Sequence, residues 1–126
     1  MDQVAFESLP IPEPILKGIR DADFKYSTPI QGKTLPLSLS GKDVAGQAQT
    51  GTGKTAAFLI TLFTRLLKNK KPLTKEWVAP RALIIAPTRE LARQIEIDAR
   101  LLGGHCKFRI FCIYGGMDYE KQRNQI

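Results

Sequence analysis

The chain has 126 residues, of which 43% are hydrophobic and 25% are charged, as is typical of one soluble globular domain. Its net charge of +7 favours polyanionic partners, such as nucleic acid or a phosphate-rich substrate. The apolar runs are too short to cross a membrane, and the N-terminus lacks the features of a signal peptide. We therefore expect a cytoplasmic protein without a membrane anchor.

Two helices are predicted before residue 41. An extended segment with Pro10 and Pro12 comes first, and Pro14 suits the first turn of a helix because apolar residues follow it at helical spacing. Thr28 and Pro29 are typical of the cap and the first position of a second helix, which would run to about position 40. Pro36 is expected to kink or split that second helix.

A glycine-containing loop lies between a predicted buried strand, residues 43–47, and a long helical pattern that follows it. Strand, loop and helix in this order are typical of a phosphate-binding P-loop. Glycines let the backbone approach phosphate oxygens, the lysine ammonium can reach the β- and γ-phosphates, and a threonine hydroxyl can bind Mg²⁺. The residues concerned are Ala48, Gln49, Thr50, Gly51, Thr52, Gly53, Lys54 and Thr55. The alternative is a glycine turn before a helix whose lysine is only solvated.

Two more strand and helix pairs are predicted after the loop. Residues 82–86 form an apolar run typical of a buried parallel strand, and Thr88 would cap a helix over 89–102. Residues 108–114 predict a third strand, and a further helix is expected from Tyr119. This alternation predicts an α/β fold with a parallel sheet flanked by helices, whose sites lie at the carboxyl ends of the strands.

His105 and Cys106 are adjacent, which raises the question of a metal site. Cys112 is the only other cysteine and there is no second histidine, so the spacing does not match a metal-ligand or disulfide framework. We expect a thiol in the core and an imidazole on the surface.

Four strings together resemble the DEAD-box ATP-dependent RNA helicases, and the similarity covers essentially the whole chain. In order and approximate spacing they match the Q motif, motif I, motif Ia and the GG motif of that family: Phe24 with Thr28-Pro29-Ile30-Gln31, the loop 48–55, Pro87-Thr88-Arg89-Glu90-Leu91-Ala92, and Gly115-Gly116. Two positions depart from the usual Q motif, since Asp23 replaces a common Gly and Ser27 a common Pro. The resemblance implies a RecA-like P-loop NTPase fold.

The resemblance also implies roles for the matching residues. Phe24 would stack on adenine and Gln31 would hydrogen-bond to its edge, which would favour ATP over GTP. The RNA backbone would be held without regard to sequence by Pro87, Thr88, Arg89, Gly115 and Gly116. Each role has a structural alternative: Phe24 as a core anchor, Gln31 as a helix cap, Arg89 paired with Glu90 or Glu96, and the glycines as a simple turn.

The family's Asp-Glu-Ala-Asp motif, which holds Mg²⁺ and positions the attacking water, has no match in the 126 residues. We therefore expect residues 1–126 to be the N-terminal part of a helicase ATP-binding domain that binds ATP with Mg²⁺ but does not hydrolyse it efficiently. Unpaired strand edges would favour self-association. Two other functions stay open: a different P-loop ATPase or kinase, and a non-catalytic RNA-binding module.

Overall fold

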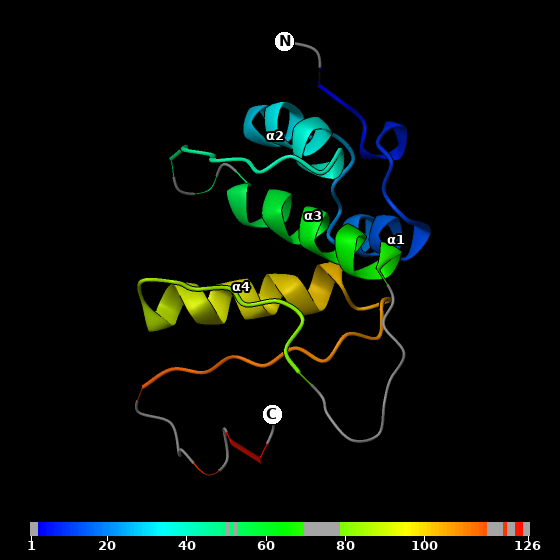
Figure 1. Cartoon of the computed structure of the whole chain (residues 1–126). Coiled ribbons are helices and arrows are strands. Elements are labelled where there is room, and N and C mark those ends of the chain that lie inside the picture. Colours follow the sequence, from blue (N-terminus) through cyan, green and yellow to red (C-terminus); the bar gives the residue numbers. More distant parts are fainter. Residues whose placement is uncertain are drawn as a thin grey trace.

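The computed structural model describes residues 3–49, 51, 53–69, 79–115, 120 and 123–124. After a 3₁₀ turn, η1 (Phe6–Ser8), come α1 (Glu13–Asp21), α2 (Pro29–Leu39), α3 (Lys54–Lys68) and α4 (Arg89–Leu102). Helices α2, α3 and α4 are stacked one below another in Figure 1, and α1 contacts both α3 and α4. The four helices predicted before residue 103 are therefore confirmed. The helix expected from Tyr119, and positions 50, 52 and 116 of the predicted sites, lie wholly or largely outside the described residues.

The helix starts follow the predicted caps. At α2 the Thr28 hydroxyl accepts a hydrogen bond from the Gln31 N–H, and Oε1 of Gln31 accepts one from the Thr28 N–H at 2.9 Å. This reciprocal capping box satisfies two backbone donors that a helix start leaves open. At α4 the Thr88 hydroxyl accepts from the Leu91 N–H at 3.2 Å. Local sequence thus determines where both helices begin.

Pro36 does not split α2, which is continuous from Pro29 to Leu39. Nη2 of Arg65, on α3, donates to the carbonyls of Ser38 (3.1 Å) and Lys42 (3.2 Å). A tertiary contact therefore satisfies carbonyl groups at the C-terminal end of α2 and just beyond it.

The core lies where α1, α3 and α4 meet, and Phe6 anchors the N-terminal segment to it with 1% of its surface exposed. Arg20 pairs with Glu7 and with Glu13, which ties η1 to α1. The fully buried side chains are Phe6, Ile15, Ile19, Leu35, Leu59, Ile60, Thr64 and Leu102. All four helices, including α2 through Leu35, and the N-terminal segment thus share one apolar core.

The predicted sheet is not confirmed in the part of the chain that the structure describes. Residues 43–47, 82–86 and 108–114 run as extended chain (Figure 1) without strand pairing, and the one β-bridge outside named strands joins Ala5 and Tyr26. The expected burial of the first two runs is wrong: residues 43–47 are exposed, and Leu83 and Ile85 are 83% and 84% exposed. The physical reason is that a strand needs a partner on its edge and a layer on each face.

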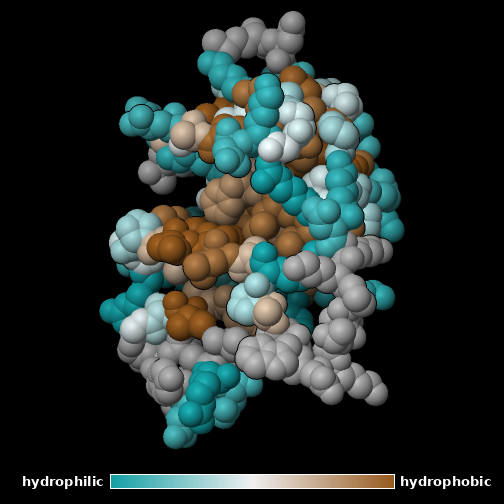
Figure 2. All heavy atoms as spheres, in the orientation of Figure 1, coloured by the Kyte–Doolittle hydropathy of each residue, from teal (hydrophilic) through white to brown (hydrophobic). Residues whose placement is uncertain are grey.

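An apolar surface results from these uncovered segments. Figure 2 shows hydrophobic side chains gathered in the middle of the face that carries the extended segments in Figure 1. The exposed apolar residues include Val44, Phe58, Leu83, Ile84 and Ile85. Within the described residues no helix is long and apolar enough to span a bilayer.

Candidate functional site

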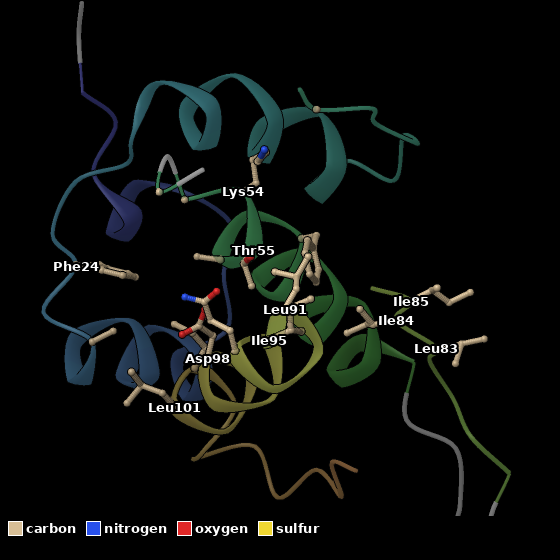
Figure 3. A pocket seen from close by; sticks show the side chains of 18 residues that line it. Phe24, Lys54, Thr55, Leu83, Ile84, Ile85, Leu91, Ile95, Asp98 and Leu101 are labelled. Atoms are coloured by element: carbon tan, nitrogen blue, oxygen red, sulfur yellow. The ribbon is translucent and has the colours of Figure 1, made fainter. Parts of the chain in front are cut away.

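A cleft of about 820 Å³ opens at the N-terminus of α3. It brings together Phe24 from the loop after α1, Leu83, Ile84 and Ile85, and one face of α4 (Figure 3). Of the residues predicted to bind nucleotide, those that line it are Phe24, Gly51, Gly53, Lys54 and Thr55. Adenine-binding and phosphate-binding candidates 27 residues or more apart in sequence therefore face one space.

The loop before α3 has the backbone that an anion site needs. Gly51 and Gly53 have φ values of 84° and 89°, in the left-handed region that glycine adopts without strain. Gly53 caps α3 with no side-chain hydrogen bond, and the first turn contains no acidic residue. The N–H groups and the positive end of the helix dipole are thus available to an anion.

Lys54 is folded back across this loop. Its Nζ donates to the Ala48 carbonyl, which closes the loop on itself. Thr55, the next residue of α3, lines the cleft with its hydroxyl group (Figure 3). An ammonium has three hydrogens, so Lys54 can hold the loop and still donate to a phosphate. The alternative of a merely solvated lysine does not describe this geometry.

Gln31 lies beneath the loop rather than on the wall of the cleft. Gln31 is 3% exposed. Its Nε2 donates to the Gly53 carbonyl at 3.1 Å, and its Oε1 accepts from the Thr28 N–H in the capping box. Gln31 therefore does cap the start of α2, as the structural alternative predicted. A glutamine amide has two donor hydrogens and two acceptor lone pairs, so these bonds leave one of each, the pair that an adenine edge requires.

The two departures from the usual Q motif have structural explanations. Asp23 has a φ of 58°, a conformation that glycine adopts readily and aspartate tolerates better than most residues. Ser27 is buried, and its N–H donates to the Val4 carbonyl at 2.8 Å, a bond that proline could not make. Phe24 stays 42% exposed beside the cleft, which argues against the core-anchor alternative.

The predicted RNA-contacting residues are brought together at the N-terminus of α4. Nη1 of Arg89 donates to the Gly115 carbonyl at 3.2 Å, although the two are 26 positions apart. Pro87, Thr88, Arg89 and Gly115 are all exposed. The alternative pairing of Arg89 with Glu96 is not what the structure shows, because Glu96 pairs with Arg100 at 3.2 Å.

Asp98 is a cleft residue that sequence reasoning missed. It lines the cleft from α4 together with Gln94, one turn earlier (Figure 3), and burial raises the pKa of its carboxyl. The signal was present in the spacing, since Asp98 follows Ile95 by three positions and precedes Leu102 by four, which places it on the inner face of the helix.

Comparisons with known proteins identify the family. The profile of the DEAD/DEAH box helicase family matches residues 28–126. The ATP-dependent RNA helicase RhlB of Pseudoalteromonas atlantica is 49% identical over 126 residues, covering 100% of this chain and 29% of that protein. The protein of that name from Actinobacillus succinogenes is 52% identical over 126 residues, covering 100% and 30%. The chain thus spans less than a third of the length of these relatives.

Solved structures give the same result for the fold. The RNA helicase Prp28 from Chaetomium thermophilum bound to ADP matches with a TM-score of 0.84 and 36% identity, over 94% of this chain and 28% of that one. A DEAD box protein from Methanococcus jannaschii matches with a TM-score of 0.81 and 35% identity, over 98% and 32%. The structural neighbours are RecA-like domains of such helicases.

Proposed function

The chain belongs to the DEAD/DEAH box helicase family, and from this premise we propose that it is the ATP-binding portion of an ATP-dependent RNA helicase of the cytoplasm. The observation that carries the proposal is the single cleft shared by Phe24 and the phosphate loop. In the whole protein, ATP binding and hydrolysis drive RNA strand separation. Residues 1–126 are the N-terminal part of its first RecA-like domain, whose parallel sheet includes residues 43–47, 82–86 and 108–114.

The phosphates of ATP bind at the start of α3. Gly51 and Gly53 leave room for phosphate oxygens close to the backbone, and the α3 dipole favours their charge. Lys54 keeps its bond to the Ala48 carbonyl and donates another of its three hydrogens to the phosphates, which are charged and therefore stronger acceptors than a carbonyl. The Thr55 hydroxyl fits Mg²⁺, a hard cation that prefers oxygen ligands and neutralises phosphate charge.

The base binds between Phe24 and Gln31. The exposed phenylalanine ring offers a face for stacking. The amide of Gln31 supplies the donor and the acceptor that its protein partners leave over. Because guanine presents a different pattern of donors and acceptors on that edge, the site prefers adenine.

Hydrolysis by these 126 residues is inefficient, because they contain no Asp-Glu-x-Asp string. Phosphoryl transfer needs carboxylates that hold the metal and position the attacking water, and positively charged side chains that stabilise the negative charge on the transferring phosphate. The RNA sugar-phosphate backbone binds at Pro87, Thr88, Arg89, Gly115 and Gly116, where Arg89 and Gly115 already lie in contact.

The test of the nucleotide site is a titration of the chain with fluorescent ADP and GDP in the presence of Mg²⁺. We expect ADP to bind at least about tenfold more tightly than GDP, because a bidentate contact between an amide and a base discriminates between bases by about 1–3 kcal/mol. Gln31→Ala should abolish the difference. Thr28→Ala is the matched control: it breaks the same capping box but keeps the Gln31 amide, so it should weaken both nucleotides equally.

Three outcomes contradict the proposal. The first is equal binding of the two nucleotides by the wild-type chain, and the second is a preference for ADP that survives Gln31→Ala. The third is hydrolysis well above background that Lys54→Ala abolishes, because the carboxylates that the mechanism needs would then lie among these residues. If the affinity for RNA is the same with and without nucleotide, and is unchanged in Lys54→Ala, the non-catalytic RNA-binding module is favoured instead.

We also propose that the chain associates with a second copy through its apolar face. A second cleft, of about 480 Å³, lies over Phe58 of α3 between Val44 on one side and Leu83 and Ile84 on the other. Both flanking segments are extended and exposed, and neither has strand pairing among the described residues. A strand from the other copy would supply hydrogen bonds to their edges and cover the apolar side chains.

Sedimentation equilibrium over a range of concentrations tests this association. We expect the apparent mass to rise above that of one chain, and Leu83→Lys with Ile85→Lys to weaken self-association at least tenfold, since a buried unpaired charge is costly. Leu37→Lys, at an exposed leucine on α2, is the control that should leave the mass unchanged. A monomeric mass at every concentration would rule the proposal out.

A further inference from the structure

Helix α4 and the extended segment 108–115 are joined at three points along their length. Arg100 Nη2 donates to the Ile110 carbonyl at 2.8 Å, Cys112 lies close enough to Glu96 for the carboxylate to raise the pKa of its thiol, and Arg89 Nη1 donates to the Gly115 carbonyl at 3.2 Å. The contacts step backwards along the helix as they step forwards along the segment. The two elements therefore run antiparallel in a defined register.

The spacing of the outer two contacts matches the geometry of the two elements. From Arg89 to Arg100 the helix advances eleven residues, which is about 16.5 Å at 1.5 Å per residue. From Ile110 to Gly115 the segment advances five residues, which is also about 16.5 Å at 3.3 Å per residue. A slip by one residue would move every contact by about 3.3 Å and turn each side chain to the other face.

Arg100 is held in place by Glu96. Its Nε donates to Glu96 Oε1 at 3.2 Å while Nη2 reaches Ile110, so two edges of one planar guanidinium are in use. Burial first, and then the Glu96 carboxylate, raise the pKa of the Cys112 thiol, although Arg93 and Arg100 oppose this. The carboxylate connects the helix arginine to the middle of the segment.

We propose that Arg100 is a positioning residue for RNA binding, which keeps segment 108–115 in the register that brings Gly115 to Arg89. The inference rests on the proposed RNA-binding function of that edge. Arg89 now donates to a neutral carbonyl, and a phosphate of single-stranded RNA is a charged and stronger acceptor. Arg100 itself points to Ile110, about three turns of α4 from Arg89, and touches no RNA.

A double-mutant cycle on RNA affinity tests the proposal. Fluorescence anisotropy with a labelled oligouridylate would compare the wild-type chain with Arg89→Met, Arg100→Met and the double variant. We expect each single change to weaken binding about tenfold, and the double variant to bind no more weakly than Arg89→Met, because both act through one contact. Arg93→Met is the matched control: it removes the same charge from the same helix, so its effect should add to that of Arg89→Met.

Hydrogen exchange supplies a readout that a general loss of stability would not mimic. Arg100→Met should speed exchange at amides 110–115 and leave α1 to α3 protected, Arg93→Met should change neither, and ADP affinity should stay as in the wild type. Arg100→Lys, which can still donate to the Ile110 carbonyl, should restore part of the RNA affinity.

The outcomes separate this inference from the function on which it rests. Losses that add between Arg89 and Arg100 show a direct contact with phosphate and overturn the positioning role, as does unchanged exchange in Arg100→Met. If the Arg100→Met variant binds RNA as tightly as the wild-type chain, the inference alone is overturned. Wild-type chain that binds ADP but no RNA overturns the proposed RNA edge, and the inference with it.

Discussion

Replacing Gly53 with alanine is expected to abolish nucleotide binding by this chain. Gly53 has a φ of 89°, and an added Cβ would overlap Nε2 of Gln31 and lie 3.1 Å from both Cδ of Gln31 and the Thr28 hydroxyl. Alanine would therefore strain the backbone at the start of α3 and expel Gln31 from its bonds to Thr28 and Gly53. The adenine and phosphate contacts would be lost together, as titration with fluorescent ADP would show.

Gly51→Ala is the matched control for this effect. Gly51 also has a positive φ, of 84°, but an added Cβ would meet nothing within 4 Å. This variant suffers only the backbone strain of about 1–2 kcal/mol, so we expect ADP binding to weaken about tenfold and not to disappear. Equal losses in the two variants would show that the contact between Gln31 and the loop does not matter. Near wild-type binding by Gly53→Ala would show that the loop can rearrange at little cost.

Replacing Gly18 with alanine is expected to lower the free energy of unfolding by about 3 kcal/mol. A Cβ at Gly18 would overlap the Leu102 carbonyl oxygen and lie 2.7 Å from its carbonyl carbon and 2.9 Å from its Cα. These are backbone atoms of α4 and cannot rotate away, so α1 and α4 would have to separate. The gain of about 1 kcal/mol in helix propensity is too small to offset this.

Urea unfolding followed by circular dichroism measures the change. Gly46→Ala is the control, because a Cβ there would meet only side-chain atoms of Ile30 and Thr34 at 3.7 Å or more and the glycine has no positive φ. We expect it to alter the stability by less than about 0.5 kcal/mol. If Gly18→Ala were as stable as Gly46→Ala, the close approach of α1 and α4 would not be a feature of the protein in solution.

Local patterns along the chain were sufficient to locate the helices. Pro14, the Thr28 cap and the Thr88 cap predicted the starts of α1, α2 and α4, and the structure confirms each of them. These signals depend on residues three or four positions apart, which contact each other in any helix. Pro36 is the exception, because it predicted a kink or a split and α2 is continuous from Pro29 to Leu39.

The motifs could also be recognised from the sequence, since the phosphate loop is one contiguous string whose glycines and lysine lie within eight residues. Sequence alone therefore predicted the anion site and, by resemblance, the family. It could not predict that Gln31 would bond to Gly53 or that Arg89 would meet Gly115. Each of these contacts depends on how separate elements pack against one another, and the spacing of residues along the chain does not specify that packing.

The predicted strands show most clearly what depends on tertiary structure and not on sequence alone. The apolar runs at 43–47, 82–86 and 108–114 have the composition of buried strands, yet the described residues do not pair there and Leu83 and Ile85 face solvent. A helix satisfies its own backbone, so sequence by itself determined the helices, the phosphate loop and the family. A strand bonds only to a partner, and the contacts of Gln31 with Gly53, Arg89 with Gly115 and Arg100 with Ile110 join residues distant in the chain. The tertiary structure alone therefore decided the pairing, the cleft and the register of the proposed RNA edge.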